Sequence, residues 1–536
     1  MAARQHARSG TGVLAVLLVC AATLRHARTP EGDNLRPRKD ALEYAVLANR
    51  LAGGDAPDVP IGDRVYPTRY PLGFPLLLAP SVLARTPPHH LWRVTAIFGV
   101  AGVVLTYWAA LRLTSPIAAT WAALLLAAAP RYAYWSVHVM SDVPAAMLTA
   151  LWALLLTGSA FAGLGIASGF ACTVRLMEVP LLAVGAFAAL ARGWRQAARF
   201  ATGAMLGLLP LLSTAIATGH SPGSGYAFWP APAARFTMSA AAANFPVYAE
   251  TLCGAAHPRF YSYLVPPFVV VGIWAGLRSH RRATVLAVVS AAAVHVMVAL
   301  FYYFRASRLL LPILPLLLLL GALGFEHLLS RRTMWTGLLG TAALFLQLRA
   351  ALAGGPTPPD VPHVAPTLLA VARRLPPDAL VVSDVAAPLA WLYWIRGTGR
   401  HFMPLAALPH DVGGDLADDY VDPLVRLAAR GVTVAPGTFL HGDHVAPAGR
   451  AVLAGPRATS VVVVLCTEYG RRELAAALAP VAVASPTVTV SGCQVATIRG
   501  KARSSPEANP GATAEGVRPG ARGRNPPARE IGRRET

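Results

Sequence analysis

Two acidic residues near the start of the chain, Asp40 and Glu43, have the type and spacing that acid–base chemistry requires. They begin a helical pattern that runs to Gly54, and residues three apart share one face of a helix. Leu47 and Leu51 follow on adjacent turns, which is typical of an amphipathic helix lying along a membrane surface. A carboxylate there could take a proton from a hydroxyl or hold a divalent cation. The alternative is an acidic first turn that only stabilises the helix dipole.

A further acid, Asp142, follows Ser141 and comes two residues before Pro144, which is the form of a helix start. As a helix cap, Asp142 needs no other role. An ionisable residue at the membrane edge, on the same side as Asp40, nevertheless allows both carboxylates to meet in one cavity.

Three arginines are candidates for binding an anion. Arg305 and Arg308 precede a proline-rich apolar run, and guanidinium groups at that interface can stabilise a phosphate leaving with negative charge. The alternative for both is a role as membrane-interface anchors. Arg175 and Glu178 interrupt an apolar stretch, so they form either a structural ion pair, which we favour, or a site where Arg175 lines a cavity as a donor.

The elements that must position these residues are membrane spans. Of the 536 residues, 55% are hydrophobic and only 14% are charged, and the mean hydropathy is +0.48. The chain is therefore too apolar for an ordinary soluble protein. Its net charge of +21 comes mainly from arginines in short loops and in the tail, which indicates membrane topology and disfavours nucleic acid as a partner.

Apolar segments predict about eleven spans, several of them shorter than the ~20 residues of a perpendicular helix. They lie near residues 11–24, 91–111, 116–130, 143–158, 160–174, 179–191, 200–218, 263–277, 284–303, 309–327 and 333–352. We expect the short segments between 143 and 191 to be tilted, bent or partly re-entrant. The first segment could instead be a cleaved signal peptide, which would leave the remaining topology unchanged.

Arginines in alternate short loops predict the orientation in the cell membrane, because positive charge is retained in the cytoplasm. The opposite, extracytoplasmic side receives the loops and ends that carry the candidate residues. These are residues 25–90, 131–142 and 219–262, the corner between Arg305 and Arg308, and everything after residue 353. The acids therefore face outward.

The sequence predicts three parts: a membrane domain at 1–355, an extracytoplasmic α/β domain at 356–500 and a disordered basic tail at 501–536. In the second part, strands are expected at 380–382 and 461–465. Helical segments are expected near 367–374, 386–396, 421–430 and 471–479. The five cysteines lack metal-ligand spacing, and a disulfide between Cys466 and Cys493 is one option.

Histidines give weaker candidates. His138 lies close to Asp142 in sequence, whereas His295 lies in mid-span and fits a hydrogen-bonded core residue better than a ligand. His441 and His444 flank Gly442-Asp443 but match no metal template, which favours a solvated loop. The metal content is left open, and the chain has no phosphate-binding loop, dinucleotide fingerprint or serine hydrolase signature.

Four segments together resemble the polyprenyl-phosphate-sugar glycosyltransferases of the C-type membrane fold (GT-C). That group includes protein O-mannosyltransferases, lipid A aminoarabinose transferases and lipopolysaccharide-core galacturonosyltransferases. The segments are Asp40–Gly54, Tyr70-Pro71-x-Gly73-Phe74-Pro75-Leu76, Ser141-Asp142-x-Pro144 and Arg308-Leu309-Leu310-Leu311-Pro312-Ile313-Leu314-Pro315. The second of these, broken by prolines and a glycine, predicts a structured turn entering the membrane.

The resemblance, which covers roughly residues 11–350, implies roles for several residues. Asp40 would be the catalytic base or a metal partner, with Glu43 beside it. Several relatives place two acids side by side, whereas two residues separate Asp40 from Glu43 here, which leaves the identity of the base open between them. Asp142 would be the second acidic position, and Arg308 the basic residue before the late span.

The expected activity is transfer of a sugar from a polyprenyl-phosphate donor to an extracytoplasmic hydroxyl of a glycan, a lipid or a protein. No cofactor is certain, and a divalent cation is an option. Asp40 would deprotonate the acceptor, Arg305, Arg308 and Arg175 would bind the donor phosphate, and direct displacement would invert the anomeric carbon. One alternative is a transporter or flippase of a lipid-linked saccharide, which should show internal symmetry and charges near the mid-plane. The other is a noncatalytic relative whose soluble domain binds a partner.

Overall fold

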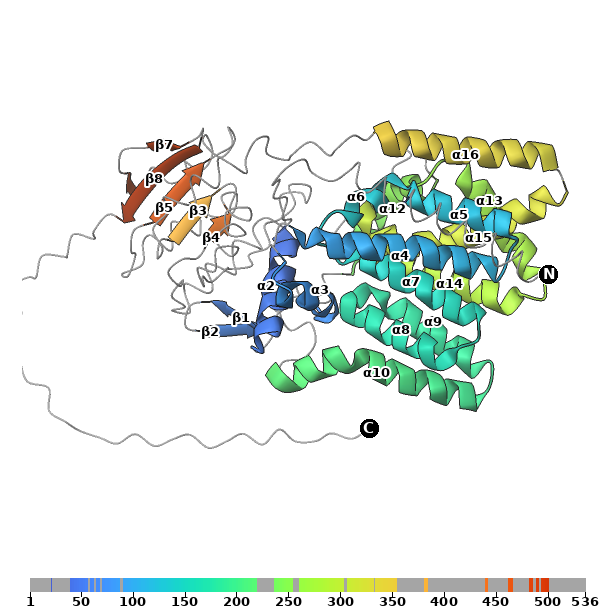
Figure 1. The fold of residues 1–536 in the computed structure, drawn as a ribbon, viewed down its shortest axis with the longest axis horizontal. Coiled ribbons are helices and arrows are strands. Elements are labelled where there is room, and N and C mark those ends of the chain that lie inside the picture. The colour runs from blue at the N-terminus through green and yellow to red at the C-terminus, as the bar shows by residue number, and fades with distance from the viewer. Residues whose placement is uncertain are drawn as a thin grey trace, which may run out of the picture. The chain divides into compact units, whose positions relative to one another are not determined.

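The computed structural model of the chain is mainly helical, as the sequence predicts (Figure 1). It describes Ala21 and residues 39–55, 58–61, 64–67, 70–86, 90–218, 236–253, 260–302, 306–331 and 333–353. It also describes short strands at 380–383, 439–441, 461–465, 482–484, 488–490 and 493–500.

Each predicted span from 91–111 onward is a helix in the structure, with ends that differ by a few residues. The helices are α4 (Trp92–Leu111), α5 (Pro116–Ala127), α7 (Asp142–Thr157), α8 (Phe161–Val174), α9 (Val179–Leu190), α10 (Trp194–Thr218), α13 (Val265–Leu277), α14 (Arg282–Phe301), α15 (Leu314–Leu329) and α16 (Thr333–Ala353). By length and composition, five described segments can cross a membrane, and shorter apolar helices such as α5, α7, α8, α9 and α13 accompany them. Apart from Ala21, the predicted span at 11–24 lies outside the described residues.

Two helix pairs, α8 with α10 and α13 with α15, approach each other so closely that only glycine fits between their backbones. A Cβ atom added at Gly203 of α10 would lie 2.0 Å from Ala162 O of α8. A Cβ atom added at Gly272 of α13 would lie 1.8 Å from Leu320 O of α15. Because apolar side chains gain little by leaving lipid for a protein interface, close backbone packing of this kind holds membrane helices together.

Buried polar side chains fix α16 to the rest of the bundle. Trp121 Nε1 of α5 donates to Gly340 O of α16 at 2.9 Å, and Gln347 Nε2 of α16 donates to Leu125 O of α5 at 2.5 Å. The Trp121 ring also stacks on Phe325 of α15, with the centroids 4.8 Å apart. Since the membrane interior offers no water to these groups, each such bond favours one register of α16 against α5.

Helix α2 (Lys39–Gly53) confirms the helical pattern expected from Asp40 to Gly54. It is followed by the hairpin of β1 (Asp58–Ile61) and β2 (Arg64–Pro67), and then by α3 (Gly73–Leu83). The expectation of a turn at Tyr70–Leu76 is wrong from Gly73 onward, where α3 begins. Pro75 is compatible with this helix because the first turn leaves its N–H groups without intrahelical partners.

Two further helices lie in segments expected to be loops, α6 (Pro130–Ser136) and α12 (Met238–Cys253). Asn244 of α12 donates from Nδ2 to Leu300 O at 2.9 Å and to Tyr302 O at 2.7 Å. These carbonyls belong to the last turn of α14 and the residue that follows it. Helix α12 is therefore held in place by capping the carboxyl end of a membrane helix.

The strands after residue 380 form a sheet in the order β4-β3-β5-β8-β6, and β7 also pairs with β8. They are β3 (Leu380–Ser383), β4 (Phe439–His441), β5 (Val461–Leu465), β6 (Ala482–Ala484), β7 (Val488–Val490) and β8 (Cys493–Gly500). β3 is parallel to β4 and β5, whereas β8 is antiparallel to β5. Strands β3 and β5 confirm the two predicted strands. The predicted helical segments lie outside the described residues, and the three domain boundaries stay predictions.

Cys493, the first residue of β8, is disulfide-bonded. Its partner lies outside the described residues. The predicted pairing with Cys466 therefore stays a prediction.

Candidate active site

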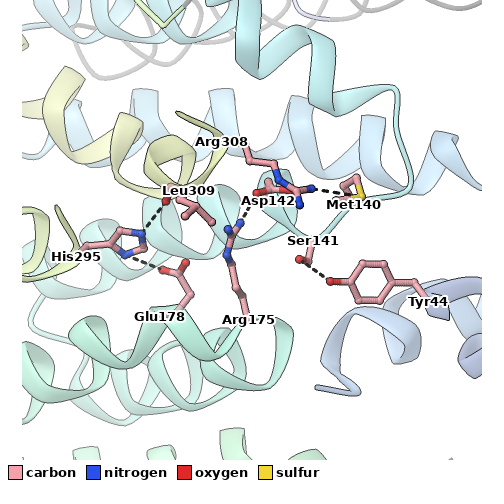
Figure 2. A network of polar contacts seen from close by, with 9 residues as sticks. All are labelled: Tyr44, Met140, Ser141, Asp142, Arg175, Glu178, His295, Arg308 and Leu309. Atoms are coloured by element: carbon pink, nitrogen blue, oxygen red, sulfur yellow. Dashed lines mark hydrogen bonds and ion pairs between the residues drawn. The ribbon is translucent and has the colours of Figure 1, made fainter. Parts of the chain in front are cut away.

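Three segments meet at one end of the helix bundle and direct charged side chains toward one another (Figure 2). Asp142 is the first residue of α7, and Arg175 directly follows α8. Arg308 lies in the 3-10 helix η4 (Ser307–Ile313), which leads into α15. The backbone of Arg175 is extended, with φ −155° and ψ 119°, and this ends α8 at the level where α7 begins.

The carboxylate of Asp142 lies between the two guanidinium groups. Arg175 Nη1 donates to Asp142 Oδ1, and Arg308 Nη1 lies 3.9 Å from Asp142 Oδ2. The Asp142 side chain is 2% exposed, compared with 12% for Arg175 and 21% for Arg308. Two cations around one carboxylate leave one positive charge in excess, in a place with little water to screen it. This arrangement attracts an anion.

The structure corrects two sequence-based expectations at this place. Arg175 donates to Asp142, not to Glu178, which we favoured as its partner. Ser141 is the residue before the first turn of α7, and Asp142 lies inside that turn, so Asp142 does not cap the helix. Its carboxylate instead binds the end of α8.

Neutral side chains support the guanidinium group of Arg308. The Cζ atom lies 5.4 Å from the ring centroid of Trp135, and Nη1 lies 4.0 Å from Met140 Sδ. Trp135 belongs to α6 and Met140 to the turn between α6 and α7. The segment from α6 to the start of α7 therefore orients Arg308, and the same segment carries Ser141 and Asp142.

Helix α2 reaches this cluster through Tyr44. The Tyr44 and Ser141 hydroxyl groups are 3.1 Å apart and hydrogen-bonded, and the Tyr44 ring contacts the rings of Tyr70 and Phe74 at 4.7 and 4.9 Å. Asp40 precedes Tyr44 by one helical turn and shares its face. The structure describes the backbone of α2 at Asp40 and Glu43 but not their side chains.

A second buried pair, Glu178 with His295, adjoins the cluster (Figure 2). Glu178 Oε2 lies 3.8 Å from His295 Nδ1, and the two side chains are 0% and 1% exposed. His295 Nε2 donates to Leu309 O at 3.0 Å, which confirms His295 as a hydrogen-bonded core residue. Neither carboxylate oxygen of Glu178 has a hydrogen-bond donor. Thr149 lies nearby, but its hydroxyl donates to Ala145 O instead.

The other sequence candidates are distant, structural or outside the described part of the chain. His138 Nδ1 lies 2.8 Å from Tyr134 O, and its ring contacts the Tyr134 ring at 4.4 Å, so it stabilises the α6–α7 turn. Arg305 and His444 lie outside the described residues. His441 belongs to strand β4, and its side chain is not described.

The described residues alone do not fit a divalent cation. They contain no group of three or more His, Cys, Asp or Glu residues that could hold a metal. Both oxygens of Asp142 face guanidinium groups, so a cation at this carboxylate would have to displace Arg175 or Arg308.

The helical bundle, the acid-bearing helix α2 before it and the mixed sheet after it together give the chain the fold of the C-type membrane glycosyltransferases. This is the fold that the four sequence segments predict. No family model and no curated protein sequence matches the chain.

The particular structures that share this fold include ArnT from Cupriavidus metallidurans, solved in the apo state and bound to undecaprenyl phosphate. The apo structure matches with a TM-score of 0.61 and 13% identity, covering 91% of this chain and 98% of ArnT. The archaeal oligosaccharyltransferase AglB from Archaeoglobus fulgidus, in complex with an inhibitory peptide and a dolichol-phosphate, matches with a TM-score of 0.56 and 13% identity, covering 93% of this chain and 75% of AglB. A complex of the Archaeoglobus fulgidus oligosaccharyltransferase with Zn and sulfate matches with a TM-score of 0.51 and 14% identity, covering 72% of this chain and 61% of that one.

Proposed function

We propose that this chain is an integral membrane glycosyltransferase that moves a sugar from a polyprenyl-phosphate donor to an acceptor hydroxyl on the extracytoplasmic side. One observation carries the proposal. Arg175 and Arg308 converge on Asp142 with one positive charge in excess, at the bundle end that α2 reaches through Tyr44. Such a site can stabilise a phosphate that departs with negative charge.

The donor phosphate binds at the two guanidinium groups, and Arg308 is the more accessible of the two. Asp142 holds Arg175 in place and keeps the site from carrying two uncompensated charges. Asp40, on the same face of α2 as Tyr44, removes the proton from the acceptor hydroxyl, with Glu43 as the alternative base. Because the acceptor oxygen displaces the phosphate directly, the anomeric carbon inverts.

Structures with the same fold support this donor class. ArnT has been solved with undecaprenyl phosphate and AglB with a dolichol-phosphate, and both ligands are polyprenyl phosphates. The acceptor is a glycan, a lipid or a protein hydroxyl.

Two independent features support the extracytoplasmic orientation. Arginine-rich loops at the opposite ends of the helices favour a cytoplasmic location for those ends. The disulfide at Cys493 also fits an oxidising compartment, because cytosolic proteins rarely keep structural disulfides. The carboxy-terminal sheet would then lie outside the cytoplasm together with the site.

A divalent cation is consistent with the fold, since one oligosaccharyltransferase structure contains Zn and sulfate. On α2 of this chain, Asp40 and Glu43 are the candidate ligands. Asp142 is not a candidate ligand, because its carboxylate is already engaged by Arg175 and Arg308.

The test is mass spectrometry of envelope glycolipids and glycoproteins from cells with and without the protein, followed by complementation with variants. Arg308→Ala and Asp40→Asn should each lower product formation by about a hundredfold or more. Arg278→Ala is the matched control, because Arg278 also lies over an indole ring, that of Trp274 at 4.4 Å, at the end of α13. Equal product levels with Arg308→Ala and Arg278→Ala would refute the assigned site.

Reconstituted vesicles distinguish the competing transporter function. A flippase moves the lipid-linked saccharide across the membrane without forming a new glycosidic bond, whereas the proposed enzyme forms product when the acceptor is supplied on the site's side. Translocation without transfer would replace the proposed function.

A further inference from the structure

Glu178 and His295 take no part in the proposed chemistry, yet each is bound to a segment that carries one of the two arginines. Glu178 ends the one-turn helix η2 (Leu176–Glu178), and its backbone N–H donates to Arg175 O at 3.0 Å. His295 of α14 donates to the carbonyl of Leu309, the residue directly after Arg308. Their 3.8 Å contact therefore joins the two arginine segments on the side away from Asp142 (Figure 2).

The bond from His295 meets a need created by the sequence of η4. In a 3-10 helix the carbonyl of Leu309 would accept a hydrogen bond from the residue three positions later. That residue is Pro312, which has no N–H group. A buried carbonyl without a donor is costly, and His295 Nε2 provides the donor at 3.0 Å.

The contacts form a closed ring. Asp142 binds Arg175, and the η2 turn connects Arg175 to Glu178. Glu178 contacts His295, which donates to the carbonyl of Leu309, next to Arg308. Arg308 in turn contacts Asp142, which closes the ring. Removing any member opens the ring. The positions of the two guanidinium groups relative to each other then depend on fewer contacts.

The donor role of His295 Nε2 limits the protonation states in which the pair attracts. With one proton fixed on Nε2, the contact between His295 Nδ1 and Glu178 Oε2 is attractive only if one further proton lies on one of these two atoms. The pair is then either a carboxylic acid with a neutral imidazole or a carboxylate with an imidazolium. In both forms its net charge is zero, so it leaves the positive excess of the arginines unchanged.

We propose that Glu178 and His295 are positioning residues whose buried contact holds the segments of Arg175 and Arg308 at the spacing that binds the donor phosphate. This inference rests on the proposed function for its ligand. Neither residue touches the phosphate, and both act through the arginine segments.

The first test measures the Kd of undecaprenyl phosphate for the purified full-length protein in lipid nanodiscs. His295→Ala should weaken binding by about threefold to tenfold, because one buried hydrogen bond to the Leu309 carbonyl is lost. His295→Gln should restore most of the affinity, since its amide N–H can reach that carbonyl. Likewise, Glu178→Gln should bind better than Glu178→Ala, because glutamine keeps a polar side chain of the same length opposite His295 Nδ1.

A double-mutant cycle distinguishes positioning from a merely structural role. If His295 acts through Arg308, the double variant Arg308→Ala/His295→Ala should bind no more weakly than Arg308→Ala alone. Gln347→Ala is the matched control, because it removes a buried polar bond in α16 away from the ring. It should lower the apparent Tm without changing the Kd. Wild-type affinity in folded His295→Ala, or losses that multiply in the double variant, would overturn the proposal.

A second cycle tests the ring without a ligand. The apparent Tm is measured for Glu178→Ala, His295→Ala and the double variant. The double variant should lose much less in apparent Tm than the sum of the losses in the two single variants. Additive losses would overturn the pairing. If the wild-type protein does not bind undecaprenyl phosphate, the proposed donor is refuted, and so is the role of the ring in binding phosphate. The Tm cycle still decides in that case whether the Glu178–His295 contact exists.

Discussion

Breaking the contact between Asp142 and Arg175 should destabilise the protein by an amount that depends on which partner is removed. Asp142→Ala leaves two guanidinium groups without the carboxylate between them. Arg175→Ala leaves Asp142 with Arg308, whose Nη1 is 3.9 Å from Oδ2. Removing one partner of a buried ion pair costs about 3–5 kcal/mol. We expect Asp142→Ala near the top of this range and Arg175→Ala near the bottom.

Arg308→Ala should cost least, because the Arg308 side chain is 21% exposed and its distance to Asp142 is longer. An unfolding entropy of about 2.1 cal/mol/K per residue, taken over about 300 residues of helical bundle, gives roughly 0.6 kcal/mol/K. A loss of about 3–5 kcal/mol then lowers the apparent Tm by roughly 5–8 °C.

The assay is thermal unfolding followed by tryptophan fluorescence, in one detergent and at one scan rate because membrane proteins often unfold irreversibly. Asp142→Asn is the control that removes the charge and keeps the shape, and it should resemble Asp142→Ala. The double variant Asp142→Ala/Arg175→Ala should lose less than the sum of the two single variants. Identical Tm values for Asp142→Ala, Arg175→Ala and Arg308→Ala would refute the assigned charge arrangement. Strictly additive losses of Tm in the double variant would refute it as well.

Three further predictions concern packing, the site and the disulfide. Gly272→Ala should sharply reduce the yield of folded protein, because its Cβ would lie 1.8 Å from a backbone oxygen. Gly337→Ala is the control: a Cβ there meets nothing within 4 Å, so this substitution should not lower the apparent Tm. Similar size-exclusion profiles for the two variants would contradict the packing. Tyr44→Phe keeps the ring contacts but loses the 3.1 Å bond to Ser141, so kcat/KM for transfer should fall about threefold to tenfold, and an unchanged value would remove α2 from the site. Cys493 should resist alkylation by a membrane-permeant reagent in intact cells until a reductant is added. Labelling without reductant would show a free thiol and remove the disulfide as support for an extracytoplasmic sheet.

The membrane spans could be predicted from the sequence because long apolar runs have few other stable environments. Helix α3 could not be predicted, since Pro75 reads as a turn residue and its tolerance in a first helical turn depends on where the helix begins. Helix α12 could not be predicted for a different reason. Its binding partners are the carbonyls at the end of α14, which are remote in sequence.

At the site, the sequence indicates which residues belong to it better than it indicates which of them contact each other. Asp142, Arg175 and Arg308 were identified as candidates from their positions at the edges of apolar segments, and the structure brings all three together. Their partners could not be read from the sequence, because Arg175 has a nearby acid, Glu178, and a distant one, Asp142. Only the packing of α7 against α8 decides between them. Tyr44 was likewise given no role from the sequence, although it links α2 to Ser141.

The setting of Arg308 makes the shape of its side chain matter as much as its charge. An indole face at 5.4 Å and a thioether at 4.0 Å orient the flat guanidinium without neutralising it. A lysine ammonium is a compact, strongly hydrated point charge and cannot lie flat against a ring in the same way. Substitution by lysine would therefore preserve the sign of the field at this position and lose the fixed direction of its hydrogen bonds.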